Sequence, residues 1–404
     1  METVDLELLL AASAPGGGSC LSSTTELEPA GGLHTSIAPA RFTPQRGDGS
    51  VYAFERRYVD GRLRTVAIVD SKQSQLNRAE AALAQAVTDA HPTLSLMPCI
   101  AVTYEGIDQP FTDLVLPHRA FDGHIRAANL NGKSVAEVPA YRAMRDATPA
   151  NARALLEGSP ITLVFGGWDS TRAKDQGRWR SALVGEIIGC CPDDKTAMRG
   201  GARVDPVAMQ INLSPDELVR IVEAQSSELS TKSATKLQGE AVKARAKTKD
   251  EAVLSGSALV LGGLPPTLSQ LAGIACDRII RSNVLSFATL RQMRFGAGPQ
   301  GDAACRALLA ALALNGLARA DAELYLRANC DLVEAAPPVL TIDQRYGRKL
   351  VLSPLTVHAA DELLARALEN AEEVADVQWT GQTMSLTGEP AIAKGRSDAE
   401  PEQD

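Results

Sequence analysis

The sequence predicts an α+β fold in which hairpin-connected strands and helices are mixed and interrupted by insertions. Hairpin turn signals occur at Asp60-Gly61 and Tyr346-Gly347, and apolar residues recur at helical spacing over about 73–88. No regular alternation of strand, helix and strand accompanies them, although a doubly wound nucleotide-binding sheet requires one. The pattern therefore favours a sheet with inserted segments.

In the first half of the chain, Gly, Ser, Thr, Ala and Pro dominate residues 11–40, so residues 1–40 are expected to be poorly ordered or loop-like. Helix 73–88 has Leu76, Glu80, Leu83 and Val87 on one face, and only Glu80 is polar. The other predicted elements are strands Tyr52–Tyr58 and Arg64–Val69, a hairpin from 102–104 and 111–116, a short helix from Thr148-Pro149 to Gly158, and strand Ile161–Phe165.

In the second half, the capping box of Ser214 and Glu217 opens a predicted helix that ends near Gln225. Residues 226–257 are polar and basic, and residues 377–404 are expected to form a disordered acidic tail. The remaining predictions are strands Val207–Ile211 and Ala258–Leu261, helices 267–281 and 302–315, a hairpin of Val339–Ile342 with Lys349–Leu352, and helix Ala359–Val374.

The net charge of −8 is concentrated at one end of the chain. Residues 361–404 hold eleven acidic and three basic residues, so the remaining chain is neutral and is compatible with a basic groove for a polyanion. The longest apolar runs, such as 161–165, are too short to cross a bilayer, and the acidic N-terminus lacks a signal-peptide pattern. Seven scattered cysteines are typical of reduced thiols. We therefore expect a cytoplasmic protein that contacts no membrane.

No motif in the sequence predicts an active site. Gly132-Lys133-Ser134 lacks the earlier glycine of a phosphate-binding loop, because position 127 is alanine, and there is no G-x-S-x-G. The cysteines and the five histidines lack metal-ligand spacing. Asp70 and Asp169 each follow a predicted strand, where a carboxylate commonly caps a turn. We predict no enzyme activity, cofactor or metal site.

Two segments have the chemistry of a binding surface. Residues 70–78 place Lys, Arg, Asn and Gln at a helix start, where they suit phosphate and ribose oxygens. A capped helix with a solvated polar face explains this segment equally well. Residues 166–172 join a glycine pair, Trp168 and small hydroxyls to the downstream bases Lys174, Arg178 and Arg180. Trp168 has two interpretations, stacking on a base or packing beneath the loop.

These segments resemble the backbone subunit of type I CRISPR interference complexes, in the I-G branch (formerly I-U) of the RAMP superfamily. The resemblance covers roughly Arg41 to Val333. It rests on Arg41-Phe42-Thr43-Pro44, Val69 to Glu80, His118-Arg119, Leu163 to Thr171, Arg180 to Ile187, Arg203-Val204-Asp205-Pro206 and the region from Leu326 to Val333.

The resemblance implies an RNA-recognition-like (ferredoxin-like) antiparallel sheet core with helical insertions, within a domain over 41–376. It also implies a projecting β-hairpin thumb, for which 101–135 and 226–257 are the candidates. Copies of such subunits polymerise as a helical filament along one CRISPR RNA, beside other interference-complex subunits, and present it for pairing with target DNA. The expected RNA contacts are Arg41, Lys72, Gln73, Gln75, Asn77, Arg78, His118, Arg119, Trp168, Ser170, Thr171, Arg172, Arg178 and Arg180.

Three functions are compatible with these residues. The first is a non-catalytic guide-RNA scaffold, in which base pairing supplies the sequence specificity. The second is a metal-dependent RNA-cleaving RAMP subunit that uses a loop aspartate, for which Asp70 and Asp169 are the candidates. The third is a protein-interaction subunit with no RNA role. The order and number of the matching motifs favour the scaffold.

Overall fold

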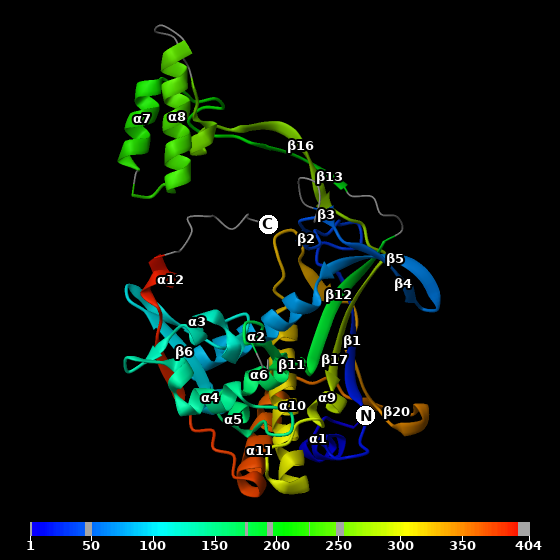
Figure 1. Cartoon of the computed structure of the whole chain (residues 1–404). Helices are drawn as coiled ribbons and strands as arrows, with labels where there is room; N and C mark the ends of the chain where they lie inside the picture. Colours follow the sequence, from blue (N-terminus) through cyan, green and yellow to red (C-terminus); the bar gives the residue numbers. More distant parts are fainter. Residues whose placement is uncertain are drawn as a thin grey trace. The chain divides into compact units, whose positions relative to one another are not determined.

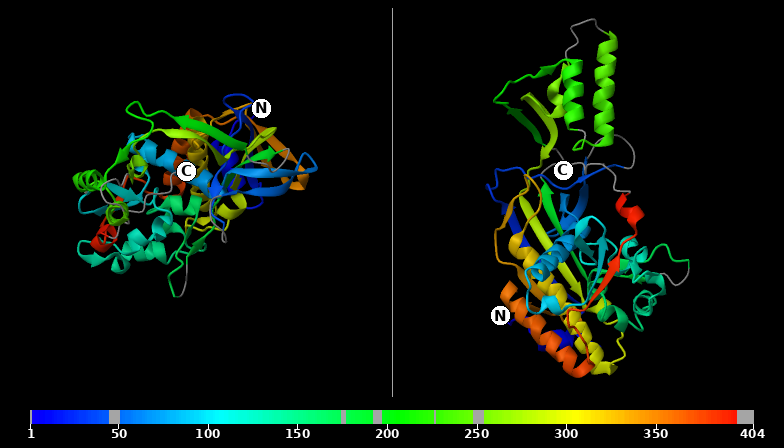
Figure 2. Two further views of the ribbon diagram at one scale, coloured as in Figure 1. Left: turned by 90° about the horizontal axis from the view of Figure 1, so that it is seen from above. Right: turned by 90° about the vertical axis from the view of Figure 1, so that its left-hand side faces the viewer.

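The computed structural model describes residues 2–44, 51–173, 177–191, 197–225, 227–247 and 254–394. It has two compact units, coloured along the chain in Figures 1 and 2. The core unit comprises Met1–Asp194 and Ala275–Lys394, and the inserted unit comprises Lys195–Ile274. In chain order, the inserted unit therefore separates two neighbouring strands of the core unit.

The core unit is built on an antiparallel eight-stranded sheet (Figure 1). Its strands follow the order β20-β19-β1-β17-β12-β5-β4, and β18 also pairs with β1. The strands are β1 (Cys20–Pro29), β4 (Phe54–Val59), β5 (Arg62–Asp70), β12 (Leu183–Cys191), β17 (Arg278–Ser286), β18 (Leu332–Glu334), β19 (Val339–Asp343) and β20 (Lys349–Leu352).

Four of these strands and two helices have ferredoxin-like connectivity. The strand order β19-β1-β17-β12 has α2 (Lys72–Thr88) between β1 and β12 in the chain, and α10 (Gly298–Glu323) between β17 and β19. This is the β-α-β-β-α-β arrangement of ferredoxin-like domains. The hairpin of β4 and β5 extends the sheet at β12, and β20 extends it at β19. The predicted α+β class is confirmed.

Helices α2 and α10 cover one face of this sheet. Along β17, Ile279, Arg281, Asn283 and Leu285 are buried in alternation with half-buried residues, as expected where one face meets helices. Helix α10 is in turn packed against α1 (Leu6–Ser13) and α11 (Val357–Ala375), and α11 lies beside it in Figure 2. By length and composition α10 is able to cross a membrane, but 83% of its most apolar window is buried, which is typical of a core helix.

A second sheet of the core unit gathers segments that are far apart in the chain. It has the order β7-β6-β21-β8-β9, with β6 (Cys99–Tyr104), β7 (Ile107–Thr112), β8 (Asn129–Leu130), β9 (Lys133–Ser134) and β21 (Thr383–Thr387). Strand β21 pairs in parallel with β6, and the buried Trp379 indole donates to the Leu156 carbonyl at 3.0 Å. The expected disorder from 377 is therefore wrong as far as α12 (Pro390–Lys394), and residues 395–404 lie outside the described residues.

The described residues of the inserted unit include two strand pairs and two α-helices. Strand β13 (Ala197–Arg203) pairs with β16 (Leu264–Gly273), and β14 (Asn212–Leu213) pairs with β15 (Leu254–Ser255). Helices α7 (Pro215–Ala224) and α8 (Thr231–Lys247) bury Leu218, Val222, Leu237 and Ala241 between them. The capping box is confirmed, because Ser214 and Glu217 exchange side-chain-to-backbone hydrogen bonds.

Several predicted helices and strands are wrong where the local pattern does not decide between the two. Residues 161–165 form α6 (Pro160–Phe165), since a short apolar run suits a buried helix as well as a strand. Residues 267–281 contribute to β16 and β17 and form no helix. Residues 207–211 are not a strand, and 258–259 belong to a 3-10 turn over Gly256–Leu259.

The expectation of a poorly ordered or loop-like segment over residues 1–40 was wrong, and two helices were right in type but wrong in extent. The N-terminal segment contains α1 and the central strand β1, in which buried Leu21, Ser23, Thr25 and Leu27 alternate with less buried residues. A composition of small polar residues favours a loop, but tertiary pairing overrides such a preference. The helix expected from Thr148 begins later, as α5 (Arg153–Leu156), and α10 extends beyond 302–315 at both ends. Hairpins β4–β5, β6–β7 and β19–β20, and helices α2, α7 and α11, are confirmed.

The shorter elements of the core unit carry much of the candidate site. They are β2 (Arg41–Phe42), β3 (Val51–Tyr52), α3 (Gly123–Arg126), α4 (Pro139–Arg145), β10 (Gly167–Trp168), β11 (Arg178–Trp179) and α9 (Phe287–Leu290).

Candidate nucleic-acid interface

Asp70, at the end of β5, is a buried anchor for two arginines. Its carboxylate accepts hydrogen bonds from Arg78 Nε at 3.0 Å, Gln75 Nε2 at 2.5 Å and Ser74 Oγ at 3.0 Å, and it also forms an ion pair with Arg327. Burial alone would raise the pKa of Asp70, but the hydrogen bonds from Arg78 and Gln75 and the positive charges hold that pKa below its ordinary value. The side chain that caps α2 is that of Ser71.

This network divides the first predicted binding segment into two groups. Gln75 and Arg78 are engaged by Asp70, and the Arg78 guanidinium also donates to the Tyr325 and Leu326 carbonyls. Lys72, Gln73 and Asn77 are exposed along α2. The sequence could not separate these groups, because the partners Tyr325, Leu326 and Arg327 are about 250 residues away in the chain.

Arg119 is also engaged inside the protein. Its Nε donates to Glu80 Oε1 at 2.5 Å, its Nη2 donates to Glu80 Oε2 at 2.6 Å, and its Nη1 donates to the Gly166 carbonyl at 3.2 Å. The neighbouring His118 is exposed. Glu80 is the one polar residue on the apolar face of α2. Because a buried charge is rarely found without a partner, this glutamate was the sequence signal for a buried ion pair.

Asp169 orders the loop after α6. Its side chain is fully buried, accepts a hydrogen bond from Arg145 Nε at 2.6 Å and lies 3.6 Å from Arg126 Nη1. Its backbone N–H donates to the Gly177 carbonyl at 2.9 Å. Neither arginine was predicted as a site residue, because both precede the loop in sequence on separate helices, α3 and α4.

The two-stranded pair of β10 and β11 presents an aromatic ring and two guanidinium groups to solvent. Trp168 is opposite Arg178 in the register, and the Arg178 guanidinium carbon lies 5.3 Å from the centre of the Trp168 ring. Trp179 points into the core, so the flanking Arg178 and Arg180 are on the outer side. Trp168 is 46% exposed, so part of this ring is accessible for stacking on a base. We call Trp168, Arg178 and Arg180 the β10–β11 basic face.

Gly166 allows the chain to enter β10. Its φ of 87° and ψ of 177° fall in a region that is essentially restricted to glycine. A Cβ at this position would lie 2.8 Å from the Trp179 carbonyl oxygen and 2.9 Å from the Ser181 nitrogen. Both atoms belong to the backbone and have little freedom to move, so the glycine is a requirement of the β10–β11 pairing.

The remaining predicted contacts are scattered. Arg172 forms an ion pair with Asp146 and donates to the Arg145 carbonyl at 3.0 Å, and Thr171 accepts a hydrogen bond from Arg126. Ser170 and Thr171 are exposed, as is Arg41 in β2.

Clefts of the core unit adjoin several of the predicted site residues. A cleft of about 410 Å³ is lined by Arg178 and Arg180 together with Pro149, Thr289 and Gln292. A second, of about 520 Å³, has Gln73 and Asn77 on one side and the 114–117 segment on the other, with Arg119 and Phe165 in its lining. A third, of about 410 Å³, is lined by Asn77 and Arg78 together with Tyr325. The structure therefore places at clefts only part of the predicted set, namely Gln73, Asn77, Arg78, Arg119, Arg178 and Arg180, and sequence reasoning missed Thr289 and Gln292.

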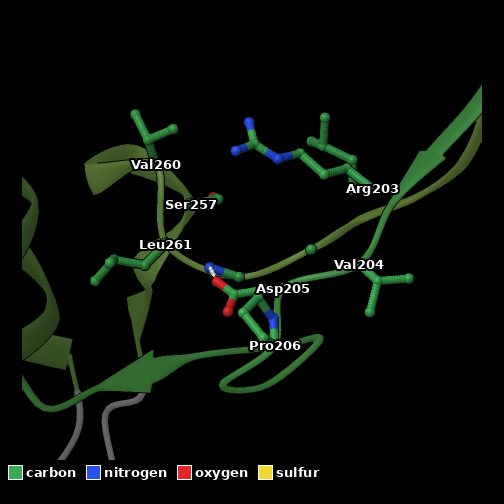
Figure 3. Close-up of a pocket in the computed structure, with 10 residues that line it drawn as sticks. Arg203, Val204, Asp205, Pro206, Ser257, Val260 and Leu261 are labelled. Atoms are coloured by element: carbon green, nitrogen blue, oxygen red, sulfur yellow. Dashed lines mark hydrogen bonds between the residues drawn. The ribbon is translucent and has the colours of Figure 1, made fainter.

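A smaller cleft, of about 220 Å³, lies within the inserted unit (Figure 3). Asp205 accepts hydrogen bonds from the backbone nitrogens of Val207 and Gly262, both at 2.8 Å, and these bonds lower its pKa. The Arg203-to-Pro206 motif thus forms a loop closed by Asp205. Across all described ranges, no group of His, Cys, Asp and Glu side chains has the geometry of a metal site.

Comparison with known families gives one match. Residues 21–191 match the family model described as CRISPR-associated protein GSU0053. The match supports a CRISPR-associated protein. It begins at the second residue of β1, ends at the last residue of β12, and includes the β10–β11 basic face, Asp70 and Asp169. No curated protein matches this chain.

Proposed function

We propose that this chain is a non-catalytic subunit of a type I CRISPR interference complex that binds the CRISPR RNA through its phosphate backbone. The observation that carries the proposal is the β10–β11 basic face. It combines an exposed ring on which a base can stack with two exposed guanidinium groups beside a cleft. Single-stranded nucleic acids are held by this combination of stacking and phosphate neutralisation.

The state of each arginine supports this choice of surface. Arg78, Arg119 and Arg172 all have carboxylate partners inside the protein. Among the ion pairs of the described residues, none involves Arg178 or Arg180, and both side chains are exposed. An uncompensated guanidinium contributes more to phosphate binding than one that must first leave a carboxylate.

The environment of the two candidate aspartates supports a non-catalytic role. Asp70 and Asp169 are each fully buried and each is held by arginines. A carboxylate that binds a catalytic metal needs oxygens directed at an accessible site. Neither aspartate meets that requirement, which disfavours the RNA-cleaving alternative.

The proposed partners follow from the CRISPR-associated family. They are the CRISPR RNA, target DNA paired to it, further copies of this chain in a filament, and other interference-complex subunits, all in the cytoplasm. We further propose that the inserted unit, which includes 226–257, is the thumb. Residues 101–135 are the weaker candidate, because they contribute β7, β8 and β9 to the second sheet of the core unit.

The proposal is tested by fluorescence anisotropy of labelled single-stranded CRISPR RNA titrated with the full-length chain at several salt concentrations. The double variant R178A/R180A is expected to weaken binding and to reduce the slope of log K against log salt by about 1.4, from two phosphate contacts. The control variant R348A/K349A removes two charges from exposed residues of the β19–β20 hairpin and should leave binding unchanged.

Absence of RNA binding by the wild-type chain would contradict the proposal, as would an equal loss in the control variant. The same samples, incubated with complementary RNA and Mg²⁺, should keep that RNA intact. Cleavage that disappears in Asp70→Ala or Asp169→Ala would establish the RNA-cleaving alternative instead.

A further inference from the structure

Two cysteine side chains of the core unit meet next to the residues at which the inserted unit begins and ends in the chain. Cys191 is the last residue of β12, and Cys276 precedes β17 by two residues. Their sulfur atoms are 4.0 Å apart, and both residues are buried, with 3% and 8% of their surface exposed. All seven cysteines of the chain are thiols in this structure.

The backbone of Gly189 makes room for this sulfur pair. A Cβ at position 189 would lie 2.5 Å from Cys276 Sγ and 3.2 Å from Val69 Cγ2, so a larger residue there would displace the Cys276 thiol. The Cys191 thiol donates a hydrogen bond to the Gly189 carbonyl at 3.4 Å. Both sulfurs are therefore held on the same side of β12 by packing and hydrogen bonding.

Cys190 is the neighbouring thiol and has different surroundings. Its side chain packs with Val59 and Val66 in a small apolar cluster of the sheet. Consecutive residues of a strand point to opposite faces, so Cys190 is directed away from Cys276 when Cys191 is directed towards it. The structure thus distinguishes two adjacent cysteines by their access to a partner.

We propose that Cys191 and Cys276 are a peroxide-oxidisable dithiol that forms an intramolecular disulfide. This modification site is independent of the proposed RNA-binding function. Side-chain rotation must bring the sulfurs from 4.0 Å to the bonding distance of about 2 Å. The bond would link the residues that flank the inserted unit and close that part of the chain into a covalent loop.

The oxidation balances with one hydrogen peroxide. One of the two sulfurs, as the thiolate, attacks a peroxide oxygen, so an S–O bond forms, the O–O bond breaks, and hydroxide leaves and takes up the thiol proton as water. The other sulfur then attacks the sulfenic sulfur, so the S–S bond forms and the S–O bond breaks, releasing a second water. Two thiols are oxidised and one peroxide is reduced to two waters.

The hydrogen bond with Cys191 and burial raise the pKa of the Cys276 thiol, and the nearby Cys190 and Asp277 raise it further. This keeps the thiol protonated at neutral pH, so the reaction is expected to be slow there. The oxidation is therefore best run on the folded full-length chain at mildly alkaline pH, followed by alkylation of remaining thiols, denaturation and digestion with trypsin without reductant.

The wild-type chain is expected to give a peptide in which residues 181–195 are linked to residues 250–278. The first peptide contains Cys190 and Cys191, and the second contains only Cys276. The linked peptide should disappear after treatment with a reductant. Because this map needs no substitution, it does not depend on the folding of a variant.

The matched variants assign the bond within the first peptide. Cys190→Ser should form the link as the wild type does, whereas Cys191→Ser and Cys276→Ser should form none. The proposal is overturned if peroxide consumes thiols without producing the 181–195 to 250–278 link. It is equally overturned if the link persists in Cys191→Ser, because the bond would then use Cys190.

Discussion

The Arg119 guanidinium and the Glu80 carboxylate form a two-point ion pair, with Nε to Oε1 at 2.5 Å and Nη2 to Oε2 at 2.6 Å. Both side chains are largely buried, with 11% and 6% of their surfaces exposed. Burial raises the pKa of Glu80, although the Arg119 hydrogen bonds oppose that rise. The pair joins α2 to the segment that follows β7, and Arg119 reaches from there to the Gly166 carbonyl.

Arg119→Ala is expected to lower the free energy of unfolding by about 3–5 kcal/mol, because it leaves the Glu80 carboxylate buried without a partner. Urea denaturation followed by circular dichroism measures the change. Arg178→Ala removes an exposed arginine and should alter stability by about 0.5 kcal/mol or less. Equal stability of the two variants would show that the Glu80–Arg119 pair does not stabilise the fold.

Lys72 and Arg78 are expected to differ although both belong to the same predicted segment. Lys72→Ala should reduce the salt slope of RNA binding by about 0.7 with unchanged stability, since Lys72 is exposed. Arg78→Ala should lower the free energy of unfolding by about 1–3 kcal/mol, since Asp70 loses a buried hydrogen-bond donor. Anisotropy and urea denaturation on both variants provide the comparison. The same change in both variants would contradict this distinction.

The buried Asp113 carboxyl is expected to make the free energy of unfolding depend on pH. Burial raises the pKa of this carboxyl to about 7 from an ordinary value of 3.8, and the Ile100 N–H donates to Oδ1 at 3.3 Å. Between those pH values the folded chain keeps a proton that the unfolded chain has lost, so the Asp113 contribution falls by about 1.4 kcal/mol per pH unit. Its stabilising effect is complete below about pH 4 and does not fall further above about pH 7.

Asp113→Asn removes this titration and keeps an oxygen that accepts from Ile100. The stability of the variant minus that of the wild type should therefore rise from pH 5 to pH 7 and become constant above pH 7. Urea denaturation at intervals of half a pH unit follows the difference. A difference that does not change with pH would exclude Asp113 as the titrating group.

Gly166→Ala is expected to destabilise the core unit more than Gly132→Ala. Both positions have a positive φ, but a Cβ at 166 meets backbone atoms of Trp179 and Ser181, whereas a Cβ at 132 has no atom within 4 Å. The conformational cost at Gly166 is about 1–3 kcal/mol before the contacts are counted. The melting temperatures of the two variants test this order, and a smaller loss at Gly166 would contradict it.

The sequence alone determined the elements whose signals are local. The turn at Asp60-Gly61, the apolar face of α2 and the capping box of Ser214 with Glu217 each lie within one segment, and each was predicted and is present. Strand and helix patterns without a regular alternation were sufficient to predict the α+β class. Arg178 and Arg180 were also predicted as RNA contacts, although the position of Arg178 opposite Trp168 was not predicted.

Only the tertiary structure decided features that depend on distant partners. The 20–29 segment is a strand because β17, β18 and β19 pair with it, and the 161–165 run is a helix that lies against α10. Arg78 and Arg119 read as solvent-facing bases in the sequence, yet buried carboxylates engage both. The physical reason is that the nearest opposite charge in space decides whether a charged side chain forms an internal ion pair or faces solvent. For Asp70 and Arg327, that neighbour is 257 residues away in the chain.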